Sequence, residues 1–379
     1  MTSAFFVSGA RTPFTRAFKG AFAEVRPDDM LVELIALCQA RQPERFGMPP
    51  EDFLVGCAYP EGEQGFNVAR SVALGAGLDV PAAVVSRLCA SSLEAVILAA
   101  GCVRAGFNKR VWVGGVESMS RIPRRGAGFT GSARIEAVAP HAYIAMGETA
   151  ERVAERYRLS RAVQEAVACD SHRKAAAAYE AGFYTDHVWP VAGSGSRDES
   201  LRATVDTAKL AALPPAFRPD GTVTAATSSP LSDGAALGMV VDAETAAAVR
   251  AATGTGTLEI LDAARAAVAP EVMGLGPIAA ITTLLSRANV PVDAISAWEV
   301  NEAFASQVLA NRGDLKLPAE RVNAWGGALA LGHPLGASGL RLMLTLERRL
   351  HREGERGDLG VAALCVGGGQ GVAILLRRP

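Results

Sequence analysis

One cysteine stands where a predicted strand gives way to a predicted helix. The β-rich run Ala82–Ser86 ends just before Cys89, and a helical pattern, Ser91–Ala105, begins just after it. The unpaired N–H groups and the dipole of a helix N-terminus stabilise a thiolate and lower the pKa of a thiol. Cys89 is therefore a candidate nucleophile, although an isolated cysteine is more often a buried structural residue.

Three more reactive residue types lie in the last third of the chain. Gly332-His333-Pro334 holds a histidine in a rigid turn, which suits proton transfer. Cys365 ends an apolar strand and precedes three glycines, whose backbone N–H groups suit an oxyanion. Asn301 follows the apolar run Ile295–Val300. Each has an ordinary alternative: a solvent-facing turn histidine, a core cysteine and a helix cap.

The elements that must position these residues alternate between β and α patterns. The predicted strands are Ala4–Val7, Asp52–Cys57, Ala83–Ser86 and Arg110–Val113. The predicted helices are Asp29–Gln42, Ser91–Ala105 and Ser160–Ala181. Such alternation is typical of an α/β fold in which helices cover the sheets.

The order strand, turn, helix, strand, glycines occurs twice, once around Cys89 and again around His333. We interpret this order as a weak internal duplication, although any α/β protein can show a similar repeated order of elements. The predicted regions are 1–120, 121–254 and 255–379. The middle region contains two predicted loops, Arg121–His141 and His187–Val205, and loops this long are more often functional than idle.

Composition restricts the class of protein. The formal net charge is −1 and apolar residues make up 49% of the chain, so nothing global indicates a nucleic-acid or anionic-membrane partner. No apolar run is expected to reach the ~20 residues that span a bilayer, and no signal-peptide pattern is present. The six cysteines include no CxxC pair, which argues against a disulfide framework or a zinc site. We expect a cytoplasmic protein.

Ordered motifs over nearly the whole chain resemble those of the thiolase family. They are Arg11-Thr12-Pro13-Phe14, Ser86-Arg87-Leu88-Cys89-Ala90-Ser91-Ser92, Gly114-Gly115-Val116-Glu117-Ser118-Met119-Ser120, Met146-Gly147-Glu148-Thr149-Ala150-Glu151, Gly221-Thr222-Val223-Thr224-Ala225, Asn301-Glu302-Ala303-Phe304, Gly332-His333-Pro334 and Cys365-Val366-Gly367-Gly368-Gly369. The resemblance implies a thiolase-like fold. Two duplicated βαβαβ-type halves would pack as a layered α/β/α/β/α sandwich, with an inserted loop region.

The resemblance also implies a mechanism. Cys89 would attack an acyl carbonyl and form an acyl-enzyme, and His333 would deprotonate Cys89. Cys365 would act as general acid and base. Asn301, through a water, would form one oxyanion hole with His333, and the backbone N–H groups of Cys89 and Gly367 would form the other. CoA would be a substrate, with no cofactor or metal required.

The same resemblance suggests residues that bind CoA thioesters. Ser229 matches a position that contacts the pantetheine arm, and Met146, Met273 and Phe304 match apolar residues around the acyl group. Ordinary packing is an equally good explanation for the last three. Weaker candidates for contacts with the CoA phosphates are Arg202, Lys209 and Arg218.

Several departures from the family pattern bear on the substrate. Ser86 replaces a common Asn, and Trp325 stands at a usually small or polar position. Ser92, Thr227 and Ala145, together with a short loop from Arg121 to Ala145, favour a 3-ketoacyl-CoA thiolase of the fatty-acid-oxidation (β-oxidation) type. A few positions rarely determine chain length.

Three other functions remain open. The first is a biosynthetic acetyl-CoA C-acetyltransferase, and the second is a decarboxylating ketosynthase, against which Cys365 counts. The third is a non-catalytic acyl-CoA-binding homologue. The resemblance further suggests a homodimer or homotetramer.

Overall fold

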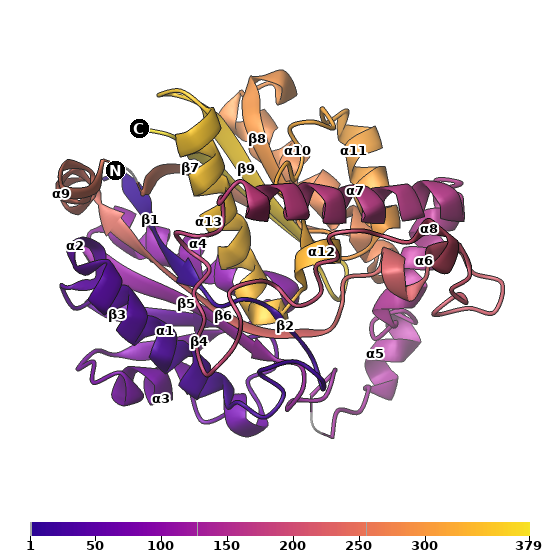
Figure 1. Cartoon of the computed structure of the whole chain (residues 1–379), viewed down its shortest axis with the longest axis horizontal. Helices are drawn as coiled ribbons and strands as arrows, with labels where there is room; N and C mark the ends of the chain where they lie inside the picture. The colour runs from indigo at the N-terminus through magenta and orange to yellow at the C-terminus, as the bar shows by residue number, and fades with distance from the viewer. Residues whose placement is uncertain (1, 127, 255) are drawn as a thin grey trace.

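The structure, a computed structural model, describes residues 2–126, 128–254 and 256–379 and contains one mixed sheet (Figure 1). The main strands of its first half are β1 (Ala4–Arg11), β3 (Asp52–Gly56), β4 (Ala82–Val85), β5 (Arg110–Ser118) and β6 (Ser232–Asp242). Those of its second half are β7 (Thr257–Ala267), β8 (Ile295–Val300), β9 (Leu359–Val366) and β10 (Gln370–Arg377). The spatial order is β4-β3-β5-β6-β1-β7-β10-β9-β8, and β2 (Thr15–Arg16) pairs with β6.

The strand arrangement of the first half recurs in the second. In the first half, β3 lies parallel between β4 and β5, β5 pairs antiparallel with β6, and β6 with β1. In the second half, β8 is parallel to β9, β9 is antiparallel to β10, and β10 to β7. A parallel bridge between Trp298 and Val322 takes the place of the β3–β4 pair. The structure thus repeats one topology, and the antiparallel pair β1–β7 joins the copies.

Two long helices form the central layer between the halves. They are α4 (Ser91–Ala105) and α13 (Leu335–Glu353), and they pack against each other. Helix α13 contacts β5 and β6 on one side and β8 and β9 on the other, and it lies in the middle of the molecule in Figure 1. The predicted bounds of α4 are confirmed, and the predicted layered α/β architecture is present.

The apolar character of α4 follows from this central position. The stretch Leu88–Ala105 is long and apolar enough to cross a membrane by length and composition, which contradicts the expectation that no run approaches that length. More than half of the stretch is buried, and its side chains Leu93, Val96 and Ala99 belong to the core shared with α13. The high apolar content of this helix therefore follows from its position inside a large core.

Outer helices cover the remaining faces of the sheet. Near the first half lie α1 (Pro27–Arg41), α2 (Pro43–Phe46), α3 (Val68–Gly75) and α9 (Ala243–Thr253), and near the second lie α10 (Gly276–Ala288) and α11 (Ala305–Leu315). Strand β1 has apolar residues on both faces. Phe5 and Val7 face the outer core with α1, whereas Ala4 and Phe6 face the central core. Burial of each such large side chain contributes ~1.5–3 kcal/mol.

Glycines let α13 approach its neighbours closely. A Cβ atom on Gly339 would lie 2.4 Å from the backbone nitrogen of Leu93 in α4. A Cβ atom on Gly115 in β5 would lie 2.7 Å from the carbonyl oxygen of Gly336. In both cases the neighbouring atom belongs to the backbone, which cannot move aside as a flexible side chain can. The start of α13, which follows His333, is therefore held tightly against the first half.

The middle of the chain contains short helices and ordered loops. Its helices are α5 (Ala133–Val138), α6 (Met146–Arg156), α7 (Arg161–Glu180) and α8 (Thr207–Ala211), and α12 (Ala328–Leu331) packs against α7. The prediction of an extended loop over Arg121–His141 was wrong in part, because helix α5 lies within it. The predicted loop His187–Val205 is confirmed. The buried pair of Arg11 and Asp198, at 2.6 Å between Nη1 and Oδ1, fixes it to β1.

Candidate active site

Cys89 lies in a single 3₁₀ turn, Leu88–Ala90, between β4 and α4. Leu88 has a positive φ of 43°, which turns the chain sharply. Ser91 holds this turn, because its Oγ accepts a hydrogen bond from the backbone N–H of Arg87 at 3.0 Å and donates one to the carbonyl of Leu88 at 2.6 Å. The side chain of Cys89 is 9% exposed. The predicted strand-to-helix location is confirmed.

The electrostatic surroundings of Cys89 differ from the expectation. Burial raises the pKa of the Cys89 thiol to about 11, and a backbone hydrogen bond from Gly367 opposes this only in part. The negative charge of Glu117 adds to the rise. Desolvation therefore outweighs the backbone hydrogen bonds that favour the thiolate. At rest the thiol is protonated, so attack on a substrate requires a base.

His333 immediately precedes Pro334, the N-cap residue of α13, and is 4% exposed. Its Nδ1 lies 2.6 Å from the Oγ of Ser338, and the same Oγ donates to the carbonyl of Pro334 at 2.8 Å. Since the hydroxyl proton of Ser338 is used in this way, the Oγ of Ser338 accepts a hydrogen bond from Nδ1–H of His333. Burial, followed by the charge of Arg341, lowers the pKa of His333 to about 3. His333 is therefore a neutral imidazole.

Asn301 follows the last residue of β8 and lies beside His333. Its Nδ2 is 3.3 Å from Nε2 of His333, and its Oδ1 accepts a hydrogen bond from Nη2 of Arg341 at 3.1 Å. Arginine has no acceptor, so the amide oxygen must face Arg341 and the amide nitrogen must face His333. Nε2 then carries a lone pair, as a general base requires.

Cys365 and Gly367 lie at the end of β9, in the turn to β10. Gly367 makes the backbone hydrogen bond to the thiol of Cys89, so the predicted oxyanion glycine lies next to the candidate nucleophile. Burial and then the proximity of Cys89 raise the pKa of the Cys365 thiol. The two thiols are thus close enough to influence each other, and both are neutral at rest.

The predicted acyl-pocket residues come together around Cys365. Met273, Phe304, Ala150, Ala303 and Val223 form one buried apolar cluster with Cys365, and Met146 packs against it. Ser229 borders this cluster, because its backbone N–H donates to the carbonyl of Ala303 at 2.9 Å. The cluster is made only of apolar groups and one thiol.

The three basic candidates for the CoA phosphates differ in their present partners. Arg202 is exposed, and its backbone N–H donates to Nδ1 of His172. The exposed Lys209 lies 3.5 Å from Asp206. Arg218 is paired with Glu148 at 2.5 Å and with Glu155 at 3.0 Å. Arg218 is therefore already neutralised, which makes it the poorest of the three as a phosphate ligand.

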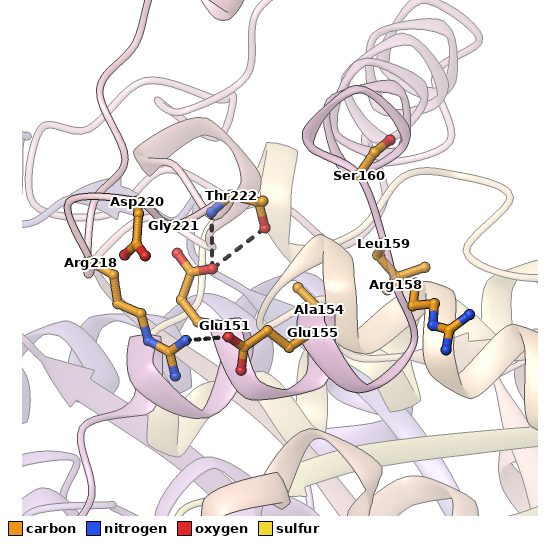
Figure 2. Close-up of a pocket in the computed structure, with 10 residues that line it drawn as sticks. All are labelled: Glu151, Ala154, Glu155, Arg158, Leu159, Ser160, Arg218, Asp220, Gly221 and Thr222. Atoms are coloured by element: carbon orange, nitrogen blue, oxygen red, sulfur yellow. Dashed lines mark hydrogen bonds and ion pairs between the residues drawn. The ribbon is translucent and has the colours of Figure 1, made fainter.

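A cavity of about 250 Å³ lies between the end of α6 and the segment that contains Arg218. Figure 2 shows the residues that line it. Glu151 points from α6 toward this segment and accepts hydrogen bonds from the backbone N–H groups of Thr222 and Val223, each at 3.0 Å. Cys89, His333 and Cys365 do not line the cavity. Glu151 instead joins two sequence motifs. Phe217, next to Arg218, lies against Phe304 of the apolar cluster, with their ring centroids 6.0 Å apart.

The sequence reasoning missed three residues that support the site. Arg341 orients Asn301, and Ser338 orients His333. The buried Glu117 accepts hydrogen bonds from Ala58 at 2.8 Å, from Gln64 at 2.8 Å and from the backbone N–H of Gly336 at 2.9 Å. The only available signal was that Glu117 belongs to a motif that resembles the family. Its carboxylate connects the end of β5 to the start of α13, next to His333.

The departures from the family pattern have structural roles. The Oγ of Ser92 accepts the backbone N–H of Leu340 at 3.0 Å, which joins α4 to α13. Thr227 caps its own turn through Thr224. Trp325 donates from Nε1 to Glu353 at 2.5 Å. Ser86 donates to the carbonyl of Ala58 at 3.1 Å. None of these bonds involves the acyl cluster, so these residues support the site without indicating an acyl length.

Comparison with known proteins gives a family for the whole chain. The family model "Thiolase, N-terminal domain" matches residues 4–244, and "Thiolase, C-terminal domain" matches residues 255–378. A 3-ketoacyl-CoA thiolase of Bacillus subtilis is 41% identical, over 98% of each chain. A beta-ketoadipyl-CoA thiolase of Pseudomonas putida is 39% identical, over 100% of each chain.

Solved structures agree with this result. Human mitochondrial 3-ketoacyl-CoA thiolase in complex with CoA has a TM-score of 0.87 and 28% identity, and the alignment covers 100% of this chain and 98% of the human one. The acetyl-CoA acetyltransferase of Bacillus anthracis also has a TM-score of 0.87, with 32% identity over 100% of this chain and 99% of that one. The chain belongs to the thiolase family.

Proposed function

We propose that this thiolase-family acyltransferase cleaves 3-ketoacyl-CoA with CoA to give acetyl-CoA and a shortened acyl-CoA, and that it catalyses the reverse Claisen condensation. One observation carries the proposal. Elements from both halves bring Cys89, the backbone of Gly367 and Cys365 together, while Asn301 leaves a lone pair on His333. These groups supply a nucleophile, a base, a second acid–base thiol and oxyanion donors.

The first half-reaction uses each of these groups once. The Cys89 sulfur attacks the C3 ketone while its proton moves to Nε2 of His333. Backbone N–H groups of Cys89 and Gly367 stabilise the resulting oxyanion, and such donors are worth ~3–4 kcal/mol each. The C2–C3 bond then breaks. Its electron pair forms the enolate of acetyl-CoA, which Cys365 protonates to release acetyl-CoA.

The second half-reaction restores the enzyme. The Cys365 thiolate left by the first step removes the proton of the incoming CoA thiol. The CoA sulfur attacks the acyl-enzyme, and the shortened acyl-CoA departs. His333 returns its proton to Cys89. No external oxidant or reductant is needed, and CoA is consumed as a substrate.

The substrate side of the proposal rests on the cluster around Cys365. Because Met146, Met273 and Phe304 offer only apolar contacts, we expect 3-ketoacyl-CoA thioesters with alkyl tails, as in β-oxidation. The experiment is a thiolysis assay over a series of tail lengths, with acetoacetyl-CoA as the shortest member. Activity on acetoacetyl-CoA alone would instead support the second candidate, acetyl-CoA C-acetyltransferase, and binding without turnover would support an acyl-CoA-binding homologue.

Further expectations concern assembly, location and metal dependence. The edge strand β4 is half-buried and apolar, and Phe66 near it is 99% exposed, which supports a homodimer or homotetramer. Light scattering after gel filtration tests this. We expect cytoplasmic localisation, which cell fractionation tests. Activity should persist after dialysis against a chelator, because the proposed steps need only thiols, an imidazole and N–H donors.

A further inference from the structure

A chain of buried polar groups extends from the candidate base into the interior. It runs from Glu299 through Arg341, Asn301 and His333 to Ser338, and each of these side chains is at most 4% exposed. Nη1 of Arg341 lies 3.5 Å from Oε2 of Glu299, and its Nη2 lies 3.1 Å from Oδ1 of Asn301. Arg341 is thus too deep to touch a substrate, yet it directly contacts a residue of the site.

The chemistry of arginine decides the orientation of Asn301. An amide side chain can rotate by half a turn and exchange its oxygen and nitrogen with little change in shape. Beside a group that only donates hydrogen bonds, the oxygen is the only acceptable neighbour. In the part of the chain that the structure describes, Arg341 is the hydrogen-bond partner of the Asn301 amide oxygen, so its loss removes the preference for one orientation at this end. In the exchanged state, the amide oxygen would face Nε2 of His333 and would draw a proton onto it.

We propose that Arg341 is a positioning residue: by fixing the Asn301 amide, it keeps His333 in the tautomer whose Nε2 accepts the proton of Cys89. Ser338 fixes the same tautomer from the other ring nitrogen. The positive charge of Arg341 also disfavours a protonated imidazole at rest. The functional consequence rests on the proposed function above, whereas the tautomer itself does not.

The second arginine on the same carboxylate provides a matched control. Arg349 lies two turns further along α13, is 2% exposed and pairs with Glu299 through Nη1 at 2.8 Å. Its other hydrogen bonds go to the carbonyls of Trp298 and Arg321. Arg341→Met and Arg349→Met therefore each remove one buried cation from Glu299. Only the first removes a contact with Asn301.

The experiment compares thiolysis by the two methionine variants. We expect kcat of Arg341→Met to fall ~10²-fold below that of Arg349→Met, as for a small misplacement of a reacting group, with little change in KM. Thermal unfolding should show similar losses of stability in both. Arg341→Lys, which keeps one charged donor but not the planar fork, should give an intermediate kcat. If Arg341→Met fails to fold, the kcat of Arg341→Lys is compared with that of Arg349→Met instead.

A spectroscopic measurement tests the tautomer independently of activity. The chain has five histidines, so the side-chain ¹⁵N signals of His333 can be assigned with a His333→Gln sample. Wild type and Arg349→Met should show a protonated Nδ1 and a bare Nε2, whereas Arg341→Met should show a mixture. Equal kcat values and equal spectra in the two methionine variants would overturn the inference. Absence of thiolysis in wild type would instead contradict the proposed function and leave the tautomer test standing.

Discussion

Cys89 and His333 occupy equivalent places in the two halves of the molecule. Cys89 lies two residues before the start of α4, and His333 lies two residues before the start of α13. In the first half, β4 leads through a single turn into α4, whereas in the second half the bridged residue Val322 is followed by a loop and the short helix α12 before α13. The surroundings of the two residues differ sharply. The thiol of Cys89 accepts backbone hydrogen bonds, whereas His333 belongs to a side-chain hydrogen-bond network that includes the charged Arg341.

The difference indicates how one repeated scaffold can supply two chemical roles. A nucleophile needs access to the substrate carbonyl and donors for the oxyanion. The backbone turn around Cys89 and the backbone N–H groups provide both. A base must have a defined tautomer, which requires polar side chains on both ring nitrogens. Helix α13 accordingly buries Ser338, Arg341 and Arg349, whereas α4 has only Glu94 as a buried charge.

Replacing the nucleophile is the largest perturbation of this comparison. Cys89→Ala should abolish acyl-enzyme formation, with kcat lower by ~10⁶-fold, because removal of a catalytic nucleophile eliminates the covalent route. Incubation with labelled acyl-CoA followed by mass spectrometry measures the formation of the acyl-enzyme. In the control Cys365→Ala, Cys89 should still become acylated, but turnover should fall by ~10²–10⁴-fold. An acyl label on Cys89→Ala would refute the assignment.

Replacement of the base, His333, is expected to have the next largest effect. His333→Gln keeps a polar side chain of similar size but cannot accept the proton of Cys89, so acylation should slow by ~10²–10⁴-fold. Rapid-quench measurement of acyl-enzyme formation separates this step from later ones. An unchanged acylation rate would mean that another group deprotonates Cys89.

The pH dependence of thiol alkylation sharpens the contrast between the two residues. With a Cys89 pKa of about 11 and a His333 pKa of about 3, both groups are neutral near pH 7 and no thiolate–imidazolium pair exists at rest. The thiolate fraction then rises about tenfold per pH unit up to pH 10. The rate of Cys89 alkylation by iodoacetamide should rise accordingly. A rate that levels off near pH 7 would show the low pKa that the helix N-terminus alone predicts.

The packing of the two central helices gives the smallest effect. Gly339→Ala should lower the free energy of unfolding by ~1–3 kcal/mol, because its Cβ would collide with the backbone of Leu93. Gly101→Ala in α4 is the control, since no atom lies within 4 Å of its Cβ position, and it should stabilise by ~0.5–1 kcal/mol. Chemical denaturation measures both. Equal effects would show that the helices are not in tight contact.

The local elements around the site could be predicted from the sequence. Short-range patterns place α4 at its observed bounds and put Cys89 before it, because periodicity and capping depend on neighbouring residues. The pKa of Cys89 could not be predicted, since it depends on how deeply the thiol is buried by distant segments. The roles of Arg341 and Ser338 were missed for the same reason, because they appear only when β8 lies beside α13.

The assembly of the halves was only partly predictable. The repeated order of elements indicates the duplication and the family motifs imply the layers, whereas the β1–β7 pair that joins the copies has no local signal. The division at 1–120, 121–254 and 255–379 stays a prediction. The apolar cluster around Cys365 gathers residues from α6, β9 and segments between them, so only the family resemblance placed Met146, Met273 and Phe304 together.

Strand β1 has a consequence for biosynthesis. It is made before the other strands of the described sheet, yet it lies between two strands made much later, with Ala4 opposite Asp242 on one side and Ile260 on the other. At about 5–20 residues per second, β1 waits roughly 10–50 s for its first partner. During that time the backbone N–H and C=O groups along both edges of this apolar strand are unpaired, which favours aggregation. We expect the newly made N-terminal segment to depend on chaperones until β6 emerges.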